Sequence, residues 1–343
     1  MMKPFMKVED EHKYLFNMGL DELKKKIVFA AIELDLFTQL EEPKTAKEVA
    51  EKMKYEIKNT EHILNALTSI DLLEKKSGEY KNREISNLYL SRNSDGFAGD
   101  LIIGYDLTLV ATLSDEDIVQ AIKEGSKSFY KDKDGLEAHK MYGDYTSILK
   151  KSQRIGRAKE ICELVKELPE FKGFKKILDL GGGPGLIGIA IGREKEDVEG
   201  VIFDTPETIV ITKECIEEYQ MEERFSTLSG DYINDDIGSN YDFVLAIGTL
   251  NFAKNNLDVV TKKIYDSLND GGVFMAISEG LVEEGTKPEQ MVLGWFPSVL
   301  KGVDFHLDQG QVSESALRSG FKSATRKTIK STNGIVDVDL LRK

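Results

Sequence analysis

Cysteine is nearly missing from this chain of 343 residues, which contains only Cys162 and Cys215. Two isolated cysteines, each inside a helical pattern, provide neither a disulfide framework nor a CxxC metal site. Their scarcity favours a reducing compartment, so we expect a cytoplasmic protein. Histidine is also rare, and the four scattered residues form no clear ligand cluster, so no metal site is predicted.

Long apolar runs and an excess of positive charge are missing as well. No run of about 18 apolar residues occurs, and the N-terminal MMKPFMKVEDEHK has no apolar core, so neither a membrane span nor a signal peptide is expected. Forty-six Lys and Arg against sixty Asp and Glu give a net charge of -14. This charge repels the phosphates of nucleic acids and of anionic membranes. The expected partner is therefore a small molecule or another subunit.

Residues 1–95 combine three helical patterns with a hairpin. The apolar-periodic ELKKKIVFAAIELDLF precedes a short helix opened by Thr45, with Glu48 three residues later as in a capping box. NTEHILNALTSIDLLEK is the third helical pattern, and Ser77-Gly78 then separates two strand-like pieces. Three helices followed by a hairpin indicate a winged-helix domain.

A winged helix suggests DNA binding, but the charges of this region disfavour that function. The expected recognition helix, NTEHILNALTSI, has no Lys or Arg after Lys58, and residues 1–90 hold 15 Lys and Arg against 17 Asp and Glu. Phosphate contacts need a basic footprint. We therefore interpret the domain as a packing and dimerisation module, and a DNA-binding, ligand-sensing regulator is the alternative.

The rest of the chain divides into connecting helices and an α/β domain. Residues 96–168 have helical patterns with few glycines, which indicates ordered connecting helices. Strand and helix patterns alternate over residues 169–343, which predicts a Rossmann-like, mostly parallel sheet of seven strands with helices on both faces. The last two strands meet around Asn333-Gly334, which predicts a C-terminal antiparallel hairpin.

The stretch KILDLGGGPGLIGIAI, residues 176–191, combines a strand, a glycine-rich turn and the start of a helix. Two glycine registers fit it: GxGxxG through Gly183, Gly185 and Gly188, and GxGxG through Gly181, Gly183 and Gly185. The first is the dinucleotide fingerprint, but alone it is weak evidence. The charge of the turn therefore has to decide which cofactor it binds.

The charge of this turn favours S-adenosyl-L-methionine (SAM) over a dinucleotide. A dinucleotide brings a doubly negative pyrophosphate that needs backbone N–H donors. Asp179 places a carboxylate beside that position, and Pro184 removes one N–H donor. SAM has no phosphate, and its ammonium and sulfonium are attracted by a nearby carboxylate.

Acidic residues after the next two strands complete an adenosine site. Asp204 ends the following strand about 20 residues on, where a carboxylate accepts hydrogen bonds from the ribose hydroxyls. In SGDY, Asp231 is a candidate acceptor for the adenine amino group, and Tyr232 offers an aromatic face to the ring. The alternative is that Asp179 and Asp231 only cap their loops.

These motifs resemble those of class I SAM-dependent methyltransferases, specifically the small-molecule O-methyltransferases with an N-terminal winged-helix dimerisation domain. The similarity covers nearly the whole chain, through AIELDLFTQLEEPKTAKEVAEKM, AIKEGSKSF, DLGGGPG, FDTPET, SGDY, GGVFMAISEG and ESALRSGF. The resemblance implies a homodimer formed through intertwined N-terminal domains and a SAM site in the second domain. It also implies an acceptor pocket between the two domains, to which residues 96–168 contribute.

The resemblance also implies roles for single residues. Gly181 and Gly183 correspond to the loop around the methionine moiety, Asp204 to the ribose ligand, and Asp231 with Tyr232 to the adenine contacts. Ser152 falls near the position of a polar residue close to the SAM carboxylate. The segments HKMYGDY and EQMVLGWFPSVL fall where the family builds its acceptor pocket, which suggests pocket roles for His139, Tyr142, Tyr145, Met291 and Trp295. The aromatic and methionine residues at helical spacing equally fit a core.

The family's histidine base is the one position that departs from the pattern. Spacing places Asn251 there, and a carboxamide does not accept a proton near neutral pH. Glu279 matches an acidic residue that supports the histidine in the family, and it is itself a candidate base.

Three readings remain for the missing base. In the first, the acceptor reacts without a catalytic base. In the second, the acceptor is methylated on carbon. In the third, another residue, such as His306 or His139, acts as the base. We expect a methyltransferase for a small, largely apolar, aromatic or cyclic acceptor, with O-methylation as the first choice. The alternative is a SAM-binding enzyme with a non-methylating reaction such as decarboxylation.

Overall fold

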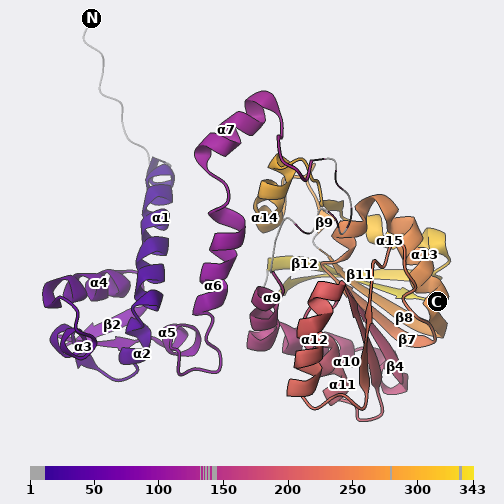
Figure 1. The fold of residues 1–343 in the computed structure, drawn as a ribbon, viewed down its shortest axis with the longest axis horizontal. Coiled ribbons are helices and arrows are strands. Elements are labelled where there is room, and N and C mark those ends of the chain that lie inside the picture. The colour runs from indigo at the N-terminus through magenta and orange to yellow at the C-terminus, as the bar shows by residue number, and fades with distance from the viewer. Residues whose placement is uncertain are drawn as a thin grey trace, which may run out of the picture. The chain divides into compact units, whose positions relative to one another are not determined.

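The computed structural model describes residues 12–131, 133, 135, 137, 140, 145–278, 280–331 and 334–343. The chain forms two compact units, the first ending at Ile103 and the second beginning at Gly104; Figure 1 labels their elements. The finer division into residues 1–95, 96–168 and 169–343 stays a prediction. Within the described ranges, no helix has the length and apolar content that a membrane crossing requires.

The first unit consists of helices and a small antiparallel sheet, in which β3 pairs with both β1 and β2. Ser77 and Gly78 connect β2 to β3 with φ angles of 50° and 89°, the left-handed pair that a two-residue hairpin turn requires. The elements of this unit are α1 (His12–Glu33), α2 (Leu36–Gln39), β1 (Lys44–Thr45), α3 (Ala46–Met53), α4 (Ile57–Ser69), β2 (Leu73–Lys76), β3 (Glu79–Asn82) and α5 (Glu84–Tyr89), followed by α6 (Gly99–Tyr105), in which the unit ends.

The capping box at the start of α3 is confirmed. The Thr45 hydroxyl accepts a hydrogen bond from the Glu48 backbone N–H at 3.2 Å, and the Glu48 carboxylate accepts one from the Thr45 N–H at 2.7 Å. Each bond satisfies a backbone donor that the first helical turn leaves unpaired. The sequence therefore fixes where this helix begins.

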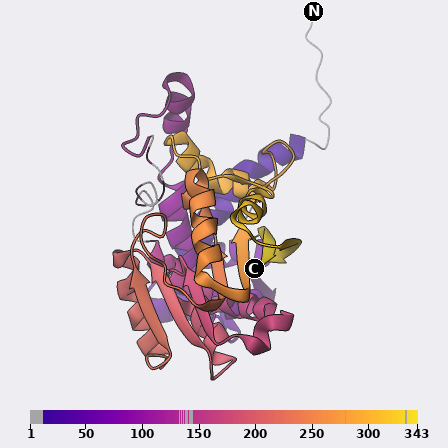
Figure 2. The same cartoon turned by 90° about the vertical axis from the view of Figure 1, so that its right-hand side faces the viewer.

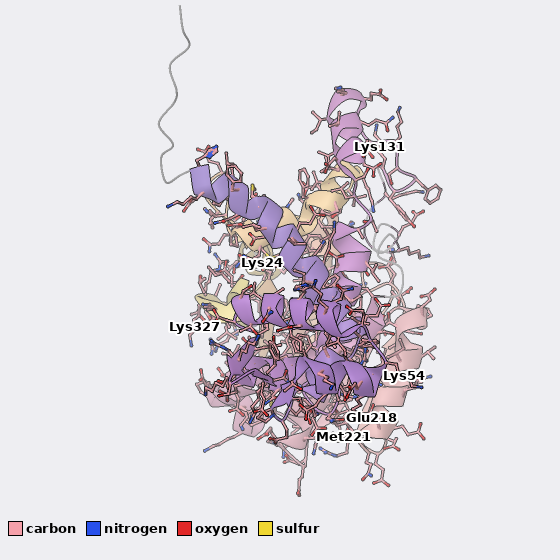
Figure 3. The ribbon with its side chains drawn as sticks, turned by 90° about the vertical axis from the view of Figure 1, so that its left-hand side faces the viewer. Lys24, Lys54, Lys131, Glu218, Met221 and Lys327 are labelled. Atoms are coloured by element: carbon pink, nitrogen blue, oxygen red, sulfur yellow. The ribbon has the colours of Figure 1, made fainter. Side chains whose placement is uncertain are left out.

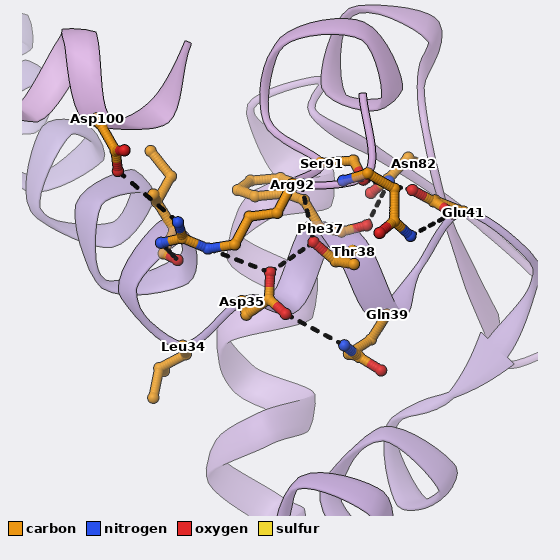
Figure 4. Close-up of polar contacts among 12 residues, drawn as sticks. Leu34, Asp35, Phe37, Thr38, Gln39, Glu41, Asn82, Ser91, Arg92 and Asp100 are labelled. Carbon is orange, nitrogen blue, oxygen red and sulfur yellow. Dashed lines mark hydrogen bonds and ion pairs between the residues drawn. The ribbon is translucent and has the colours of Figure 1, made fainter. Parts of the chain in front are cut away.

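A polar network holds the end of α1 to the segment that precedes α6 (Figure 4). The Asp35 carboxylate accepts a hydrogen bond from Thr38 Oγ1 at 2.5 Å and lies 3.5 Å from Arg92 Nε. The Arg92 guanidinium also lies 3.8 Å from the Asp100 carboxylate. Arg92 thus connects the end of α1, which is far from it in sequence, to the start of α6.

The first half of α1 extends beyond the other elements of its unit (Figure 1). Its fully buried residues, Ala31 and Ile32, lie in the last turn. Six large apolar side chains before them are between 51% and 70% exposed: Tyr14, Leu15, Phe16, Met18, Leu20 and Leu23. Figure 3 shows the side chains of this helix, which also contains Lys24. An apolar surface of this size is unusual for a segment that faces only water.

The second unit is built on a seven-stranded sheet with the order β11-β12-β8-β7-β4-β5-β6. Every pairing from β6 through β5, β4 and β7 to β8 is parallel, and β12 is antiparallel to both of its neighbours. The predicted fold class is confirmed. The strands are β4 (Lys176–Leu180), β5 (Glu199–Asp204), β6 (Phe225–Ser229), β7 (Tyr241–Ile247), β8 (Leu268–Ser278), β11 (Ser323–Ser331) and β12 (Gly334–Arg342).

Helices cover both faces of this sheet (Figures 1 and 2). Alternate strand residues enter two cores: Ile177 belongs to the core that α10 and α11 share, and Leu178 to the core of α13 and α15. This alternation follows from the period of two residues along a strand. The α-helices of the second unit, whether or not they pack on the sheet, are α7 (Asp115–Glu124), α9 (Thr146–Ser152), α10 (Ala158–Lys166), α11 (Leu186–Arg193), α12 (Pro206–Glu218), α13 (Leu257–Ser267), α14 (Glu289–Leu300) and α15 (Gln311–Ser319).

Short elements complete the second unit. Two π-helical segments, η1 (Asp106–Val110) and η3 (Gln153–Arg157), follow α6 and α9 directly. Two 3₁₀ segments, η4 (Pro169–Gly173) and η5 (Leu250–Asn256), precede β4 and α13. The two-stranded parallel pair β9 (Gly280–Leu281) and β10 (Leu307–Asp308) stands apart from the main sheet.

The C-terminal hairpin joins β11 to β12 through a two-residue connection. Ser331 pairs with Gly334, and Gly334 has a φ of 113°, a left-handed conformation that favours glycine. The predicted antiparallel hairpin is therefore present. Asn333, which the sequence places in the turn, lies outside the described residues.

Candidate cofactor and acceptor site

A cavity of about 270 Å³ lies at the carboxyl ends of β4, β5 and β7, and all of its lining residues belong to the second unit. The strand order reverses at β4, which has β5 on one side and β7 on the other. Ligands of open α/β sheets bind at such a reversal point. Nine residues predicted from the sequence line this cavity: Tyr145, Ser152, Asp179, Gly181, Gly183, Asp204, Tyr232, Met291 and Trp295.

The glycine-rich turn follows β4 in a conformation that favours glycine. Gly181, Gly183 and Gly185 have φ angles of 65°, 61° and 79°, which side chains with a Cβ rarely adopt. A Cβ on Gly181 would lie 2.2 Å from Thr249 Oγ1. The backbone of the turn therefore passes directly against the segment after β7, and Gly181 and Gly183 both border the cavity.

Replacing Gly181 with Ala is expected to weaken binding of S-adenosylhomocysteine (SAH) at least tenfold. The left-handed backbone costs an alanine about 1–2 kcal/mol, and the contact with Thr249 adds to that cost. Calorimetric titration measures the effect. Gly173→Ala is the control, because nothing lies within 4 Å of the added Cβ. Equal affinity of Gly181→Ala and native protein would show that this turn does not hold the ligand.

Asp179 is a buried carboxyl group at the end of β4. It is 3% exposed, and its Oδ2 accepts a hydrogen bond from the Gly188 N–H at 3.0 Å. Burial raises the pKa of Asp179 to about 7, and the negative charge of Asp204 adds to the increase. Gly182 makes this placement possible, since a Cβ there would lie 2.8 Å from the Asp179 carboxyl group. A cation in the cavity would favour the ionised form of Asp179.

Asp204 connects β5 to the glycine-rich turn. Its Oδ2 accepts a hydrogen bond from the Gly183 N–H at 2.8 Å, and its Oδ1 accepts one from the Thr205 N–H at 2.7 Å. A carboxylate has about four lone-pair sites, so it can accept hydrogen bonds from several donors at once. Asp204 borders the cavity, which is where a ribose hydroxyl has to reach it.

Tyr232 and Asp231 follow β6 but have different surroundings. Tyr232 borders the cavity, and its hydroxyl donates a hydrogen bond to the Thr249 carbonyl at 2.6 Å; burial raises its pKa. Asp231 is not among the lining residues. Its carboxylate accepts hydrogen bonds from the Ile233 N–H at 2.9 Å and from Asn234 Nδ2 at 2.6 Å. These bonds fit the loop-capping alternative, and the adenine contact of Asp231 stays a prediction.

Two lining residues next to Ser152 were missed from the sequence, Gln153 and Arg157. Gln153 Oε1 accepts a hydrogen bond from the Leu186 N–H at 3.0 Å, so it caps the first turn of α11. Arg157 lies four residues later in η3 and is 7% exposed. Gly156 between them has a φ of 149°, and π-helical segments are frequent at functional sites. In the sequence, the only sign that Gln153 and Arg157 share a helix face is their i, i+4 spacing, and the same spacing is found on helix faces exposed to water.

Aromatic side chains form the part of the wall next to α14. Phe252 lies 6.2 Å from Trp295 between ring centroids, with the rings nearly perpendicular, and both residues border the cavity. Met291 and Tyr145 border it as well. This wall offers an apolar, aromatic surface to a ligand. The predicted pocket residues His139 and Tyr142 lie outside the described residues.

Two residues predicted for catalysis, Asn251 and His306, are not among the described residues that line the cavity. Asn251 is 1% exposed, its Nδ2 donates a hydrogen bond to the Phe305 carbonyl at 2.9 Å, and its Oδ1 has no hydrogen-bond partner in the described part of the chain. His306 Nδ1 lies 2.8 Å from Asp304 Oδ1, and its buried Nε2 has no hydrogen-bond partner there either. Glu279 lies outside the described residues. The catalytic roles of these three residues stay predictions.

Two protein-family models match the chain. The O-methyltransferase dimerisation domain matches residues 22–92, and the O-methyltransferase domain matches residues 116–298. An uncharacterised protein of Methanocaldococcus jannaschii is 30% identical over 71% of this chain, and the match spans 64% of that protein. Acetylserotonin O-methyltransferase of Macaca mulatta is 26% identical over 82% of this chain and 84% of its own length.

A solved structure has the same fold. Human N-acetylserotonin methyltransferase in complex with SAM superposes with a TM-score of 0.76 and 21% identity, over 99% of each chain.

Proposed function

Because the chain belongs to the SAM-dependent O-methyltransferase family, we propose that it transfers the methyl group of SAM to a small aromatic acceptor, with oxygen as the first-choice atom. The observation that carries this proposal is the composition of one cavity. Glycine-rich backbone and two carboxyl groups, Asp179 and Asp204, border the same space as an aromatic wall. The glycine-rich backbone and the carboxyl groups suit a cationic adenosine cofactor, and the aromatic wall suits a flat acceptor.

The residues at the carboxyl ends of β4 and β5 would hold the cofactor. Asp204 would accept hydrogen bonds from the ribose hydroxyls, and Asp179 would balance the positive charge of the methionine moiety; both residues border the cavity, which supports these roles. SAM supplies a methyl group already activated by its sulfonium. The tasks left for the chain are to position the two reactants and to exclude water.

Replacing Asp204 with Asn is expected to weaken SAH binding at least tenfold. The amide keeps one acceptor oxygen but loses the charge, and hydrogen bonds to a charged group contribute about 1.5–3 kcal/mol. Titration calorimetry measures the change. Asp258→Asn is the control, because the carboxylate of Asp258 is exposed and bonded to Arg318. If Asp204→Asn binds SAH as tightly as native protein does, Asp204 is not the ribose ligand.

Two observations support an aromatic acceptor: the aromatic wall of the cavity and the names of related enzymes. Phe252 and Trp295 present aromatic rings to the cavity. The names of three relatives refer to acetylserotonin, to 3-hydroxy-5-methyl-1-naphthoate and to L-tyrosine, each of which contains an aromatic ring. Two relatives have names that refer to methylation on nitrogen and on carbon. Which atom this enzyme methylates would therefore depend on the acceptor that it binds.

We propose that positioning contributes more to the rate than base catalysis does. Asn251, at the family's base position, is held by the Phe305 carbonyl, and a carboxamide is not a base. His306 is the candidate base if one is needed, because Asp304 orients its Nδ1 and leaves Nε2 as the acceptor of a proton.

A second subunit is also proposed: the apolar first half of α1 suits a homodimer formed through the N-terminal domain.

Methyl transfer tests the proposal directly. Native protein is incubated with deuteromethyl-SAM and a panel of phenols, hydroxyindoles and hydroxynaphthalenes, and both products are measured by mass spectrometry. We expect a deuteromethylated acceptor and an equal amount of SAH. Product formed without SAH, or SAH binding with no transfer to any aromatic acceptor, would contradict the proposed reaction.

A further inference from the structure

Arg157, Gln290 and Ser331 form a polar group at one end of the cavity, here called the arginine corner. Arg157 Nη1 donates a hydrogen bond to Ser331 Oγ at 3.2 Å. Gln290 lies beside Gly334, where an added Cβ would be 3.3 Å from Gln290 Nε2. Ser331 and Gly334 are paired at the end of the β11–β12 hairpin. Arg157 and Gln290, which both border the cavity, therefore lie beside the same hairpin end.

The charge of Arg157 is not balanced by any described residue. Its side chain is 7% exposed, and it is the only basic residue among the described residues that line the cavity. In the described ranges its side chain has one hydrogen-bond partner, the Ser331 hydroxyl, and no carboxylate within ion-pair distance. A guanidinium keeps its charge in proteins and has five N–H donors. Burying it without an anion is costly, so this arrangement fits a site completed by an anionic ligand.

We propose that the arginine corner binds a carboxylate group of the acceptor, an inference that rests on the proposed methyl transfer. The planar guanidinium forms two parallel hydrogen bonds with a carboxylate. The Gln290 amide, which lies near the same hairpin end and also borders the cavity, is an additional donor. The enzyme would then select aromatic acids over neutral aromatic compounds of the same shape.

The strand order favours the acceptor over the cofactor as the source of this anion. Asp204 ends β5, and five strand spacings separate β5 from β11, where Ser331 lies. At ~4.8 Å each, these spacings amount to roughly 24 Å along the sheet. The methionine chain of SAM begins at the ribose and is only a few bonds long. A ribose on Asp204 would therefore leave the cofactor carboxylate well short of Ser331.

A single negative charge fits the site better than a phosphate group. One guanidinium is available, and the same cavity is lined by Asp179 and Asp204. A phosphate monoester has a charge of about −1.5 to −2 near neutral pH, and the two carboxyl groups would repel it. A carboxylate needs only the one cation.

Binding of paired probes tests the proposal. SAH-loaded protein is titrated with hydroxybenzoate, hydroxycinnamate and hydroxynaphthoate, each beside its carboxamide. We expect native protein to bind at least one acid more tightly than its amide. In Arg157→Met the affinity for that acid is expected to fall at least roughly 30-fold, since truncating one partner of a buried charge pair costs 2 kcal/mol or more. SAH affinity stays unchanged, and Arg157→Lys restores part of the preference because it keeps the charge.

Arg154→Met is the matched control, because Arg154 lies in the same helical segment, is exposed and pairs with Glu218. It should behave as native protein does. Without ligands, Arg157→Met should melt no lower than native protein, because an unbalanced buried charge is removed; a purely structural arginine predicts a lower melting temperature.

Three results would overturn the assignment: native protein prefers none of the acids, Arg157→Met keeps the preference, or Arg157→Met weakens SAH binding but not that of methylthioadenosine, which lacks the methionine carboxylate. Failure of native protein to bind SAH at all would instead contradict the proposed function.

Discussion

Replacing Asp179 with Asn is expected to weaken SAH binding and to stabilise the protein without ligand. The pKa of Asp179 is raised from 3.8 to about 7 by burial. Between pH 4 and pH 7 the folded protein keeps a proton that the unfolded chain has released, so the free energy of unfolding falls as pH rises through that interval and is constant above it. Asparagine does not ionise, and its Oδ1 still accepts the Gly188 N–H. At pH 8 the variant should be more stable by up to about 4 kcal/mol.

The same substitution should remove the pH dependence of cofactor binding. The sulfonium of SAM and the ammonium group of both SAM and SAH favour ionised Asp179, so native protein should take up either ligand with release of a proton and bind it more tightly at pH 8 than at pH 6. In Asp179→Asn the affinity should be at least about tenfold lower at pH 8 and independent of pH. Denaturant unfolding and calorimetry in buffers of different ionisation enthalpy measure the two effects.

Asp339→Asn is the control for this prediction. Asp339 is equally buried, but its carboxylate accepts hydrogen bonds from Arg326 at 2.7 and 3.0 Å. Removing its charge takes away the nearer carboxylate partner of the Arg326 guanidinium, whose other carboxylate, Asp337, is 3.9 Å away, so this variant should be less stable than native protein. An Asp179→Asn variant that is also destabilised, and that binds SAH with native affinity, would show that Asp179 has a structural role only.

Replacing Phe16 and Leu20 together with Glu is expected to convert a dimer into folded monomers. The two side chains are 70% and 51% exposed and lie one helical turn apart in α1. They add little to the stability of a single chain, but two charges in an apolar interface would remain unpaired and desolvated. Sedimentation equilibrium measures the molecular mass, and circular dichroism checks that the variant is folded.

Val210→Glu is the control, because Val210 is 60% exposed in α12 of the second unit. It introduces a charge at an exposed apolar position outside α1 and its unit, and it should leave the dimer intact. Native protein that is monomeric at micromolar concentration, or a Phe16→Glu/Leu20→Glu variant that still dimerises, would contradict a dimer formed through α1.

The sequence predicts the architecture well because each of these elements is determined by residues that are close together in the chain. In β4, Ile177 enters one core and Leu178 and Leu180 enter the other, and apolar residues on both sides mark a strand covered on both faces. Thr45 and Glu48 form the capping box that starts α3, and Ser77-Gly78 has the left-handed geometry of a hairpin turn. These features depend on neighbours in the chain, which is the information that a sequence contains directly.

The candidate site is predicted less completely because it is assembled from distant segments. Asp179 and Asp204 are found through the motifs that end their strands. Gln153 and Arg157 are missed, since a polar residue that faces a cavity has the same pattern as one that faces water. Asn251 and His306 are identified by spacing, but which surface they border depends on how η5 and the segment before β10 pack, and no motif encodes that packing.

Calorimetric titration of native protein with SAH at pH 8 tests the central claim most directly. The claim is that the cavity at the ends of β4, β5 and β7 holds an adenosine cofactor without phosphate. We predict saturable binding at one site per chain, with no comparable binding of NADH, whose pyrophosphate the carboxyl groups of Asp179 and Asp204 would repel. No binding of SAH at millimolar concentration, or tighter binding of NADH, would contradict the account.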